Sequence, residues 1–121
     1  MAESHNLGQQ GEDIATVHLK EAGYKILFRN WKWGKHEIDI IAENSDFIIF
    51  AEVKTRSDDY LMHPVIAVTK EKQKSIILAA EGYIRRFNID KESRFDIITI
   101  VKKGGNMEID HIEDAFYPTL R

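Results

Sequence analysis

The sequence predicts an α/β fold, in which helices flank a mixed β-sheet in the order α-β-β-β-α-β-β. Two segments carry apolar residues at helical spacing, and five shorter segments have the apolar patterns of strands. One helical segment joins the third and fourth strands, and such a crossover is typical of parallel strands with a right-handed connection. A chain of 121 residues is expected to form one domain, spanning residues 1–121.

The first helix is expected over residues 6–22. Asn6 is its candidate N-cap, because asparagine side chains accept hydrogen bonds from the first helical N–H groups. Gly23 is its expected stop, since glycine readily takes the left-handed conformation after a helix. A strand-like segment over residues 24–33 follows and ends near Gly34.

The second and third strands are expected to form a hairpin. Residues 37–43 alternate between two faces, as a strand does. Asn44, Ser45 and Asp46 are turn formers, and the apolar run over residues 47–53 is the third strand.

A polar loop over residues 57–63 precedes the second helix, for which Thr69 is the candidate cap. The fourth strand is expected over residues 95–101, and a turn at residues 102–106 leads to a short fifth strand over residues 107–112. The apolar positions of the second helix recur at helical spacing. They are Ile76, Ile77, Ala80, Tyr83, Ile84 and Phe87.

Composition narrows the class of protein. No apolar run approaches the roughly 20 residues of a membrane helix, and the polar start is unlike a signal peptide. The absence of cysteine excludes disulfides and thiolate metal sites, and it fits the cytoplasm, where we expect the protein. The net charge of −3 argues weakly against a nucleic-acid partner. Clusters of basic residues, at positions 25–36 and 70–74, soften that objection.

Glu52 and Lys54 are unexpected in the apolar third strand. Strand side chains alternate, so both point to the same face, together with Ile48 and Phe50. Both faces of this strand are apolar, which predicts a central strand covered on both sides. Charged groups in such a place are costly unless they are paired or bind a metal.

The predicted topology brings two further acids towards this pair. Asp39 lies on the neighbouring strand of the hairpin, and Glu12 interrupts the small apolar face of the first helix, where Gly8 and Gly11 would allow a close approach. Three converging carboxylates repel one another unless a cation compensates. Oxygen ligands without cysteine fit Mg²⁺ rather than Zn²⁺. Lys54 beside the metal would position water or offset charge on a phosphate.

Each of these residues also has a structural explanation. A Glu-X-Lys pair is common on strands, Glu12 could pair with a lysine, and Asp39 could cap a turn or pair with Lys35. The five histidines lack the spacing of metal ligands. Trp31 and Trp33 share one strand face, where core packing explains them better than base stacking. Only the combination of the four charged residues in this order of elements points to catalysis.

Glu12, Asp39, Glu52 and Lys54 in this order resemble the PD-(D/E)XK nuclease superfamily. Its pattern is an acid on a first helix, a hairpin carrying Asp and then (Asp/Glu)-X-Lys, and a following helix. Over residues 8–116 the chain resembles still more the YraN-like bacterial family of that superfamily. The matching motifs are Gly8-x-x-Gly11-Glu12-x-x-Ala15, Arg29-Asn30-Trp31, Glu37-Ile38-Asp39-Ile40-Ile41-Ala42, Glu52-Val53-Lys54-Thr55-Arg56, Lys72-Gln73, Arg94-Phe95-Asp96 and Ala115-Phe116.

Two positions depart from the family pattern. His36 stands where the family usually has a glycine, and Ile38 stands where the superfamily name suggests a proline. The first change would alter the start of the second strand. Neither change touches the four charged positions.

The resemblance implies a restriction endonuclease-like, three-layer fold and a Mg²⁺- or Mn²⁺-dependent endonuclease. The substrate would be nucleic acid, with structured or branched DNA favoured by the likeness to archaeal-type Holliday junction resolvases, which act as dimers; a homodimer is therefore expected. Glu12, Asp39, Glu52 and the Val53 carbonyl would hold the metal, and Lys54 would orient water. The candidate contacts to nucleic acid are Arg56, Lys72, Gln73, Lys32 and Lys35.

Two alternatives remain beside this hypothesis. One is a module on the same fold that binds nucleic acid without cutting it, which the acidic overall balance favours. The other is a structural protein with buried ion pairs, which requires the agreement of the motifs to be accidental.

Overall fold

The computed structural model describes residues 4–57 and 68–118. The elements follow the predicted order α-β-β-β-α-β-β. The expected loop over residues 57–63 lies outside the described residues, apart from position 57, which belongs to the third strand. The elements are α1 (Ser4–Glu21), β1 (Lys25–Trp33), β2 (His36–Glu43), β3 (Phe47–Ser57), α3 (Lys70–Phe87), β4 (Glu92–Lys103) and β5 (Asn106–Phe116).

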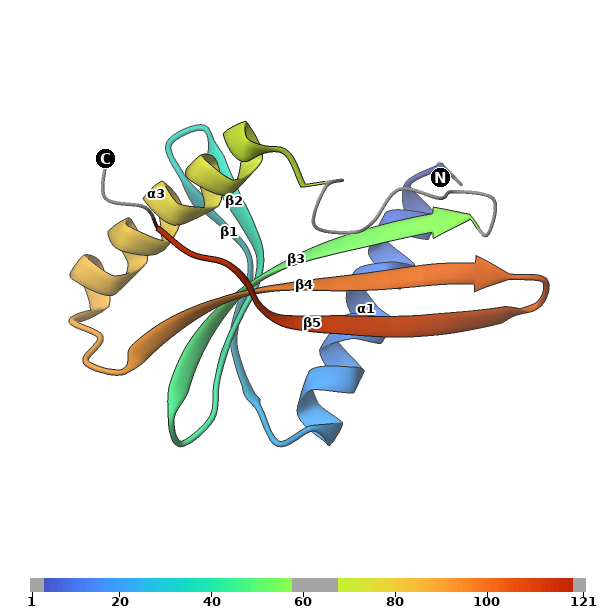
Figure 1. Cartoon of the computed structure of the whole chain (residues 1–121), viewed down its shortest axis with the longest axis horizontal. Coiled ribbons are helices and arrows are strands. Elements are labelled where there is room, and N and C mark those ends of the chain that lie inside the picture. The colour runs from blue at the N-terminus through green and yellow to red at the C-terminus, as the bar shows by residue number, and fades with distance from the viewer. Residues whose placement is uncertain (1–3, 58–67, 119–121) are drawn as a thin grey trace.

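The five strands form one mixed sheet in the order β1-β2-β3-β4-β5 (Figure 1). Three neighbouring pairs are antiparallel, and β3 and β4 are parallel, because α3 carries the chain back between them. The mixed sheet and the parallel crossover are therefore confirmed. β3 lies in the centre of the sheet, as the two apolar faces of its sequence predict.

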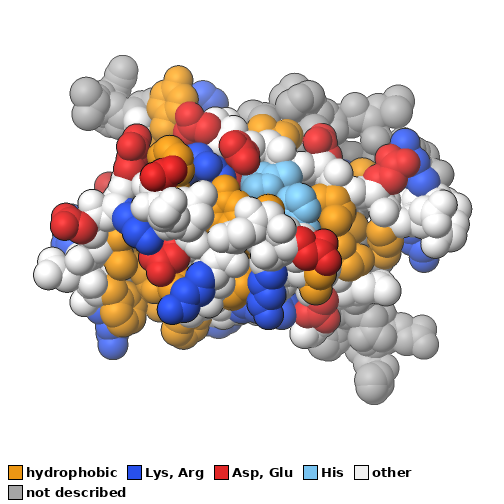
Figure 2. Space-filling view, turned by 90° about the horizontal axis from the view of Figure 1, so that it is seen from below, with side chains coloured by type: hydrophobic (Ala, Val, Ile, Leu, Met, Phe, Trp, Pro, Cys, Tyr) orange, Lys and Arg blue, Asp and Glu red, His pale blue; other side chains and the backbone are white. Residues whose placement is uncertain are grey.

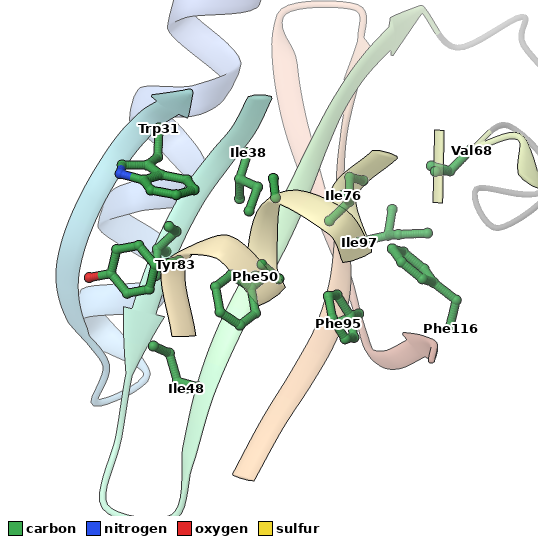
Figure 3. Packing of buried hydrophobic residues seen from close by; sticks show 13 residues of the cluster. Trp31, Ile38, Ile48, Phe50, Val68, Ile76, Tyr83, Phe95, Ile97 and Phe116 are labelled. Atoms are coloured by element: carbon green, nitrogen blue, oxygen red, sulfur yellow. The ribbon is translucent and has the colours of Figure 1, made fainter. Parts of the chain in front are cut away.

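The two helices cover opposite faces of the sheet. Ile48 and Phe50 of β3 belong to a core cluster with α3, whereas Ile49 and Ala51 belong to a cluster with α1. Alternate residues of one strand therefore enter different cores, and the protein has three layers. Figure 3 shows the α3 core, in which Tyr83 lies edge-on to both Trp31 and Phe50.

The helix ends are set by local chemistry. Gly23 has a φ of 96°, and the N–H of Tyr24 donates to the Leu19 carbonyl at 2.9 Å, which confirms the predicted end of α1. Thr69 is confirmed as the cap of α3, since its hydroxyl accepts from the N–H of Lys72 at 3.1 Å. The prediction of Asn6 as the cap of α1 was wrong, because the helix already includes Ser4.

The predicted hairpin between β2 and β3 is confirmed. Asn44 Oδ1 accepts hydrogen bonds from the N–H groups of Asp46 and Phe47 at 2.9 and 2.8 Å, so one side chain holds the turn. The third, fourth and fifth strands extend beyond their predicted ends, to Ser57, Lys103 and Phe116. The length of β3 is relevant to the candidate site, because Glu52 and Lys54 lie beyond the last residue of β3 that pairs with β2.

Candidate active site

The candidate site lies where β2 and β3 stop pairing. Their register ends at Ile40↔Ala51, whereas β3 pairs with β4 as far as Ser57↔Lys102. The second half of β3 is therefore held by β4 on one side, and β2 leaves its other side. Backbone groups along that side need other hydrogen-bond partners.

Asp39 supplies one of these partners. Its Oδ2 accepts a hydrogen bond from the N–H of Val53 at 2.8 Å, in the place of a carbonyl on a neighbouring strand. The N–H and C=O of one strand residue point to the same neighbour, so the Val53 carbonyl also faces the side of Asp39. That direction fits the predicted role of Val53 as a main-chain ligand.

Asp39 and Glu52 form a buried pair of acids. Glu52 is only 4% exposed. Burial raises the pKa of Asp39 to about 8, and the nearby charge of Glu52 adds to this rise against the opposing hydrogen bond from Val53. Burial also raises the pKa of Glu52, although Lys72 and Lys54 oppose the rise. Two such carboxyl groups share a proton near neutral pH rather than ionise together.

One oxygen of this pair has no donor. Glu52 Oε1 is buried and accepts no hydrogen bond within the described part of the chain. The Nζ of Lys54 lies 3.7 Å from the other oxygen, Oε2, and forms an ion pair with it. A buried carboxylate oxygen without a donor, beside a second acid and a main-chain carbonyl, fits a hard divalent cation. The binding of Mg²⁺ or Mn²⁺ at this place stays a prediction.

Glu12 approaches the pair without joining it. Its charge contributes to the raised pKa of Asp39, but its Oε1 lies 3.4 Å from the guanidinium of Arg29, which also binds Asp13 at 3.0 Å. Across residues 4–57 and 68–118, no three His, Asp or Glu side chains are spaced as ligands of a single metal ion. The structure thus brings Asp39 and Glu52 together, with Glu12 held aside on Arg29.

The position of α1 depends on Gly11, which has no side chain. A Cβ on Gly11 would overlap Thr55 Oγ1 of β3, so glycine lets the helix rest against that strand next to Glu12. Gly8 has no atom within 4 Å of such a Cβ. The predicted close approach is therefore confirmed at Gly11 and wrong at Gly8.

The predicted nucleic-acid contacts fall into two groups. Lys72 is close enough to the site for its charge to oppose the rise in the pKa of Glu52, more strongly than the charge of Lys54 does. Lys35 and Lys72 line a surface hollow of about 480 Å³ at the start of α3. Lys32, in contrast, is paired with Glu37 at 3.7 Å, on the exposed part of β1.

The other two predicted contacts lie nearby. Arg56 is half-buried on β3, two residues after Lys54. The side-chain nitrogen of Gln73 donates to the Val68 carbonyl at 3.0 Å, so this side chain holds the start of α3. His36, the departure from the family pattern, begins β2 and joins it to α3 through a hydrogen bond to Ser75 Oγ at 2.6 Å.

A second polar cluster lies on the α1 face of the sheet. Asp96 is fully buried and accepts hydrogen bonds from Arg94, from His111 and from the N–H of Asp114. His111 in turn bonds to His18 of α1 at 3.0 Å. Figure 2 shows histidine surface lying between hydrophobic and charged side chains. Sequence patterns missed this cluster, because His18 and His111 are 93 positions apart.

This cluster is expected to stabilise the fold rather than to act in catalysis. Asp96→Asn should lower the free energy of unfolding at pH 7 by about 2–4 kcal/mol, because it removes the buried charged partner of Arg94 and leaves only the exposed Glu113, at 3.8 Å. Urea unfolding measures this loss, and Asp110→Asn on the exposed side of β5 is the control.

The pH dependence of the loss has a defined sign. The hydrogen bonds from His111 and Arg94 keep the pKa of Asp96 below its ordinary value of 3.8, despite its burial. The contribution of Asp96 is therefore present above about pH 4 and is lost as the pH falls through its lowered folded-state pKa. If the free energies of unfolding of the wild type and of Asp96→Asn differ as much at pH 2.5 as at pH 7, this account is contradicted.

Comparison with known proteins places the chain among relatives of the same size. The model of the uncharacterised protein family UPF0102 matches residues 11–100. A UPF0102 protein of Parabacteroides distasonis is 48% identical over 121 residues, which is the whole of both chains. Relatives named UPF0102 protein in Bacteroides fragilis and Chlorobium phaeobacteroides are 48% and 43% identical, and the matches cover 99% and 95% of this chain and 99% and 96% of theirs.

These matches confirm the resemblance to the YraN-like family, and the names of these relatives state no activity. Among the described residues, neither helix has the length and apolar character needed to span a bilayer.

Proposed function

This chain belongs to the uncharacterised protein family UPF0102, and we propose that it is a metal-dependent endonuclease that hydrolyses phosphodiester bonds of nucleic acid. The observation that supports this function best is the buried pair of Asp39 and Glu52. The pair combines a raised pKa, a carboxylate oxygen without a donor and two neighbouring lysines. Perturbed acids of this kind are typical of functional sites.

The proposed metal is Mg²⁺ or Mn²⁺. Asp39, Glu52 and the Val53 carbonyl would hold it, and Glu12 would join them when its carboxylate leaves Arg29. When bound, the ion supplies Lewis-acid polarisation of the phosphate and a water of lowered pKa. Oxygen ligands are those that both ions accept.

Side chains near the acid pair would supply the other groups that the reaction needs. Lys54, paired with Glu52, carries the amine that would orient the attacking water and offset the charge that develops on the phosphate. Lys72 and Lys35 present positive charge on the neighbouring surface. Arg56 would contact a flanking phosphate, which positions a strand without reading its sequence. Structured or branched DNA is the proposed substrate, and a homodimer the proposed assembly, both on the resemblance to resolvases.

A non-cleaving nucleic-acid-binding module is the second candidate. The ion pair between Glu12 and Arg29 favours it, because it keeps the third acid away from the pair. The two candidate functions use the same binding surface and differ only in whether the bound nucleic acid is cleaved.

A cleavage assay on a panel of substrates separates these candidates. Branched, flapped and linear DNA and RNA are incubated with Mg²⁺ or Mn²⁺, and cleavage of at least one substrate is expected. Lys54→Ala should lower kcat by about 10²–10³-fold, as the loss of one charge-stabilising donor does elsewhere. Lys20→Ala, at an exposed position of α1 outside the basic clusters, is the matched control. Binding without cleavage under both metals would contradict the endonuclease and leave the module.

A further inference from the structure

We propose that a groove along α3 binds an unpaired nucleic-acid strand, with Trp33 as the surface on which a base stacks. This inference rests on the proposed function, since the strand would be an unpaired arm of the same substrate. The groove lies between the turn that joins β1 to β2 and one face of α3. Its parts are an exposed tryptophan, two surface hollows and a row of basic side chains.

Trp33 is exposed in a way that its neighbour is not. Trp31 is 7% exposed and belongs to the core, whereas Trp33 is 41% exposed. The two rings stack at 5.8 Å between centroids and 14° between planes. A large aromatic side chain at the surface is typical of a binding site when it is held in a fixed orientation.

Gly82 holds the Trp33 indole against the helix. A Cβ on Gly82 would lie 2.5 Å from the indole, so only glycine lets the ring approach the α3 backbone this closely. The ring is therefore fixed by Trp31 and by Gly82 while part of it stays exposed to solvent. An incoming base would find a rigid surface, which reduces the entropy lost on binding.

Two hollows follow the same face of α3. One, of about 400 Å³, is lined by Trp33, Gly82, Arg85 and Arg86. The other, of about 480 Å³, lies at the start of the helix, where the hydrogen bond between His36 and Ser75 joins the helix to β2. The helix residues that line the two hollows recur at three- and four-residue spacing, so they share one face. They include Glu71, Ser75, Leu78, Gly82 and Arg85.

The charge of this groove suits phosphates. Among the residues that the structure describes, five basic side chains line the two hollows, and Glu71 is the single acid that does so. None of the five forms an ion pair with another residue in the part of the chain that the structure describes. The guanidinium of Arg86 lies 5.7 Å from the centre of the Phe87 ring, a contact that leaves its charge without an acid. Basic groups without an acidic partner are available to neutralise a nucleic-acid backbone. These side chains are Lys35, Lys72, Lys74, Arg85 and Arg86.

The length of the groove defines the length of the strand. Lys72 marks the end near the acid pair, and Arg85 lies 13 positions later on α3, which is roughly 20 Å at the rise of an α-helix. A stacked strand with about 3.4 Å per nucleotide covers this distance with about six nucleotides. A single strand is favoured over a duplex, because only unpaired bases can stack on an aromatic side chain.

Binding without metal tests this proposal separately from cleavage. The full chain is titrated, in EDTA, into labelled DNA that is single-stranded, duplex, or forked with unpaired arms of two or eight nucleotides. Trp33→Ala should weaken binding of the single strand and of the long fork by about tenfold or more, and change duplex binding little. Phe28→Ala, another exposed aromatic of β1 outside the groove, is the matched control.

The basic residues have a different signature. Arg85→Ala and Arg86→Ala should each weaken binding of every DNA and lower the slope of log affinity against log salt by about one. Circular dichroism verifies that all variants are folded, and Trp33→Phe, which keeps an aromatic ring, should restore part of the affinity.

Equal binding by Trp33→Ala and the wild type, or tighter binding of duplex than of single strand, would overturn the inference. If Trp33→Ala cleaves the forks with short and with long arms at the wild-type rate, the inference is overturned and the proposed endonuclease activity stands. Trp33-dependent binding without cleavage in Mg²⁺ or Mn²⁺ would support it and count against the endonuclease instead.

Discussion

Glu52→Gln is expected to lower metal-dependent cleavage by about 10³-fold or more. Glu52 has an oxygen without a hydrogen-bond donor next to Asp39, so its loss removes a charged ligand from the centre of the proposed site. Charge stabilisation by a bound metal is worth several kcal/mol, and each 1.36 kcal/mol of barrier is a factor of about ten in rate. Single-turnover cleavage at saturating Mn²⁺ measures this effect.

The control for this variant is Asp46→Asn, which neutralises an exposed acid at the far end of the same hairpin. It should cleave at the rate of the wild type. Glu52→Gln that retains more than about a tenth of the wild-type rate would contradict the role of Glu52, because a lost metal ligand cannot leave the barrier nearly unchanged.

Asp39→Asn is expected to stabilise the metal-free protein at high pH and to leave it nearly unchanged at low pH. The pKa of Asp39 rises from 3.8 to about 8 on folding, so the folded protein binds a proton that the unfolded chain releases. The stability of the wild type therefore falls as the pH rises from about 4 to about 8. Asparagine keeps an acceptor for the N–H of Val53 and removes the titrating charge.

The expected gain for Asp39→Asn at pH 8 is about 2–4 kcal/mol, which is roughly 5–15 °C in Tm for a chain of this size. Thermal unfolding in EDTA at pH 5 and pH 8 measures it, and Asp46→Asn again serves as the control. A variant whose Tm differs from that of the wild type by the same amount at both pH values would show that Asp39 is not held in its acidic form by the fold.

The pattern of the sequence predicted the framework of the fold because that pattern is local. Apolar alternation placed β2, a continuous apolar run placed β3, and the capping chemistry of Thr69 and Gly23 placed two helix ends. The polar end of β3 was missed, because pairing with β4 holds residues up to Ser57 in a strand that their own propensity does not favour.

Part of the candidate site was predictable for the same reason. Asp39 and Glu52 lie on consecutive strands of a hairpin, so their proximity follows from the topology. The partner of Glu12 was not predictable, because the reach of Arg29 depends on how α1 crosses the sheet. The expectation of core packing was confirmed for Trp31 and wrong for Trp33, which is exposed. The two side chains have the same strand parity, and α3 distinguishes them, because Tyr83 covers Trp31 whereas Trp33 lies against Gly82.

Calorimetric titration with Mn²⁺ tests the central claim most directly, since it needs no knowledge of the substrate. At pH 7 the wild type should bind Mn²⁺ and release about one proton, the one that Asp39 and Glu52 share, and buffers of different ionisation enthalpy measure that number. Glu52→Gln should bind Mn²⁺ at least about tenfold more weakly, whereas Asp46→Asn should match the wild type. Binding of equal affinity in Glu52→Gln, or binding without proton release, would contradict a metal site at the acid pair.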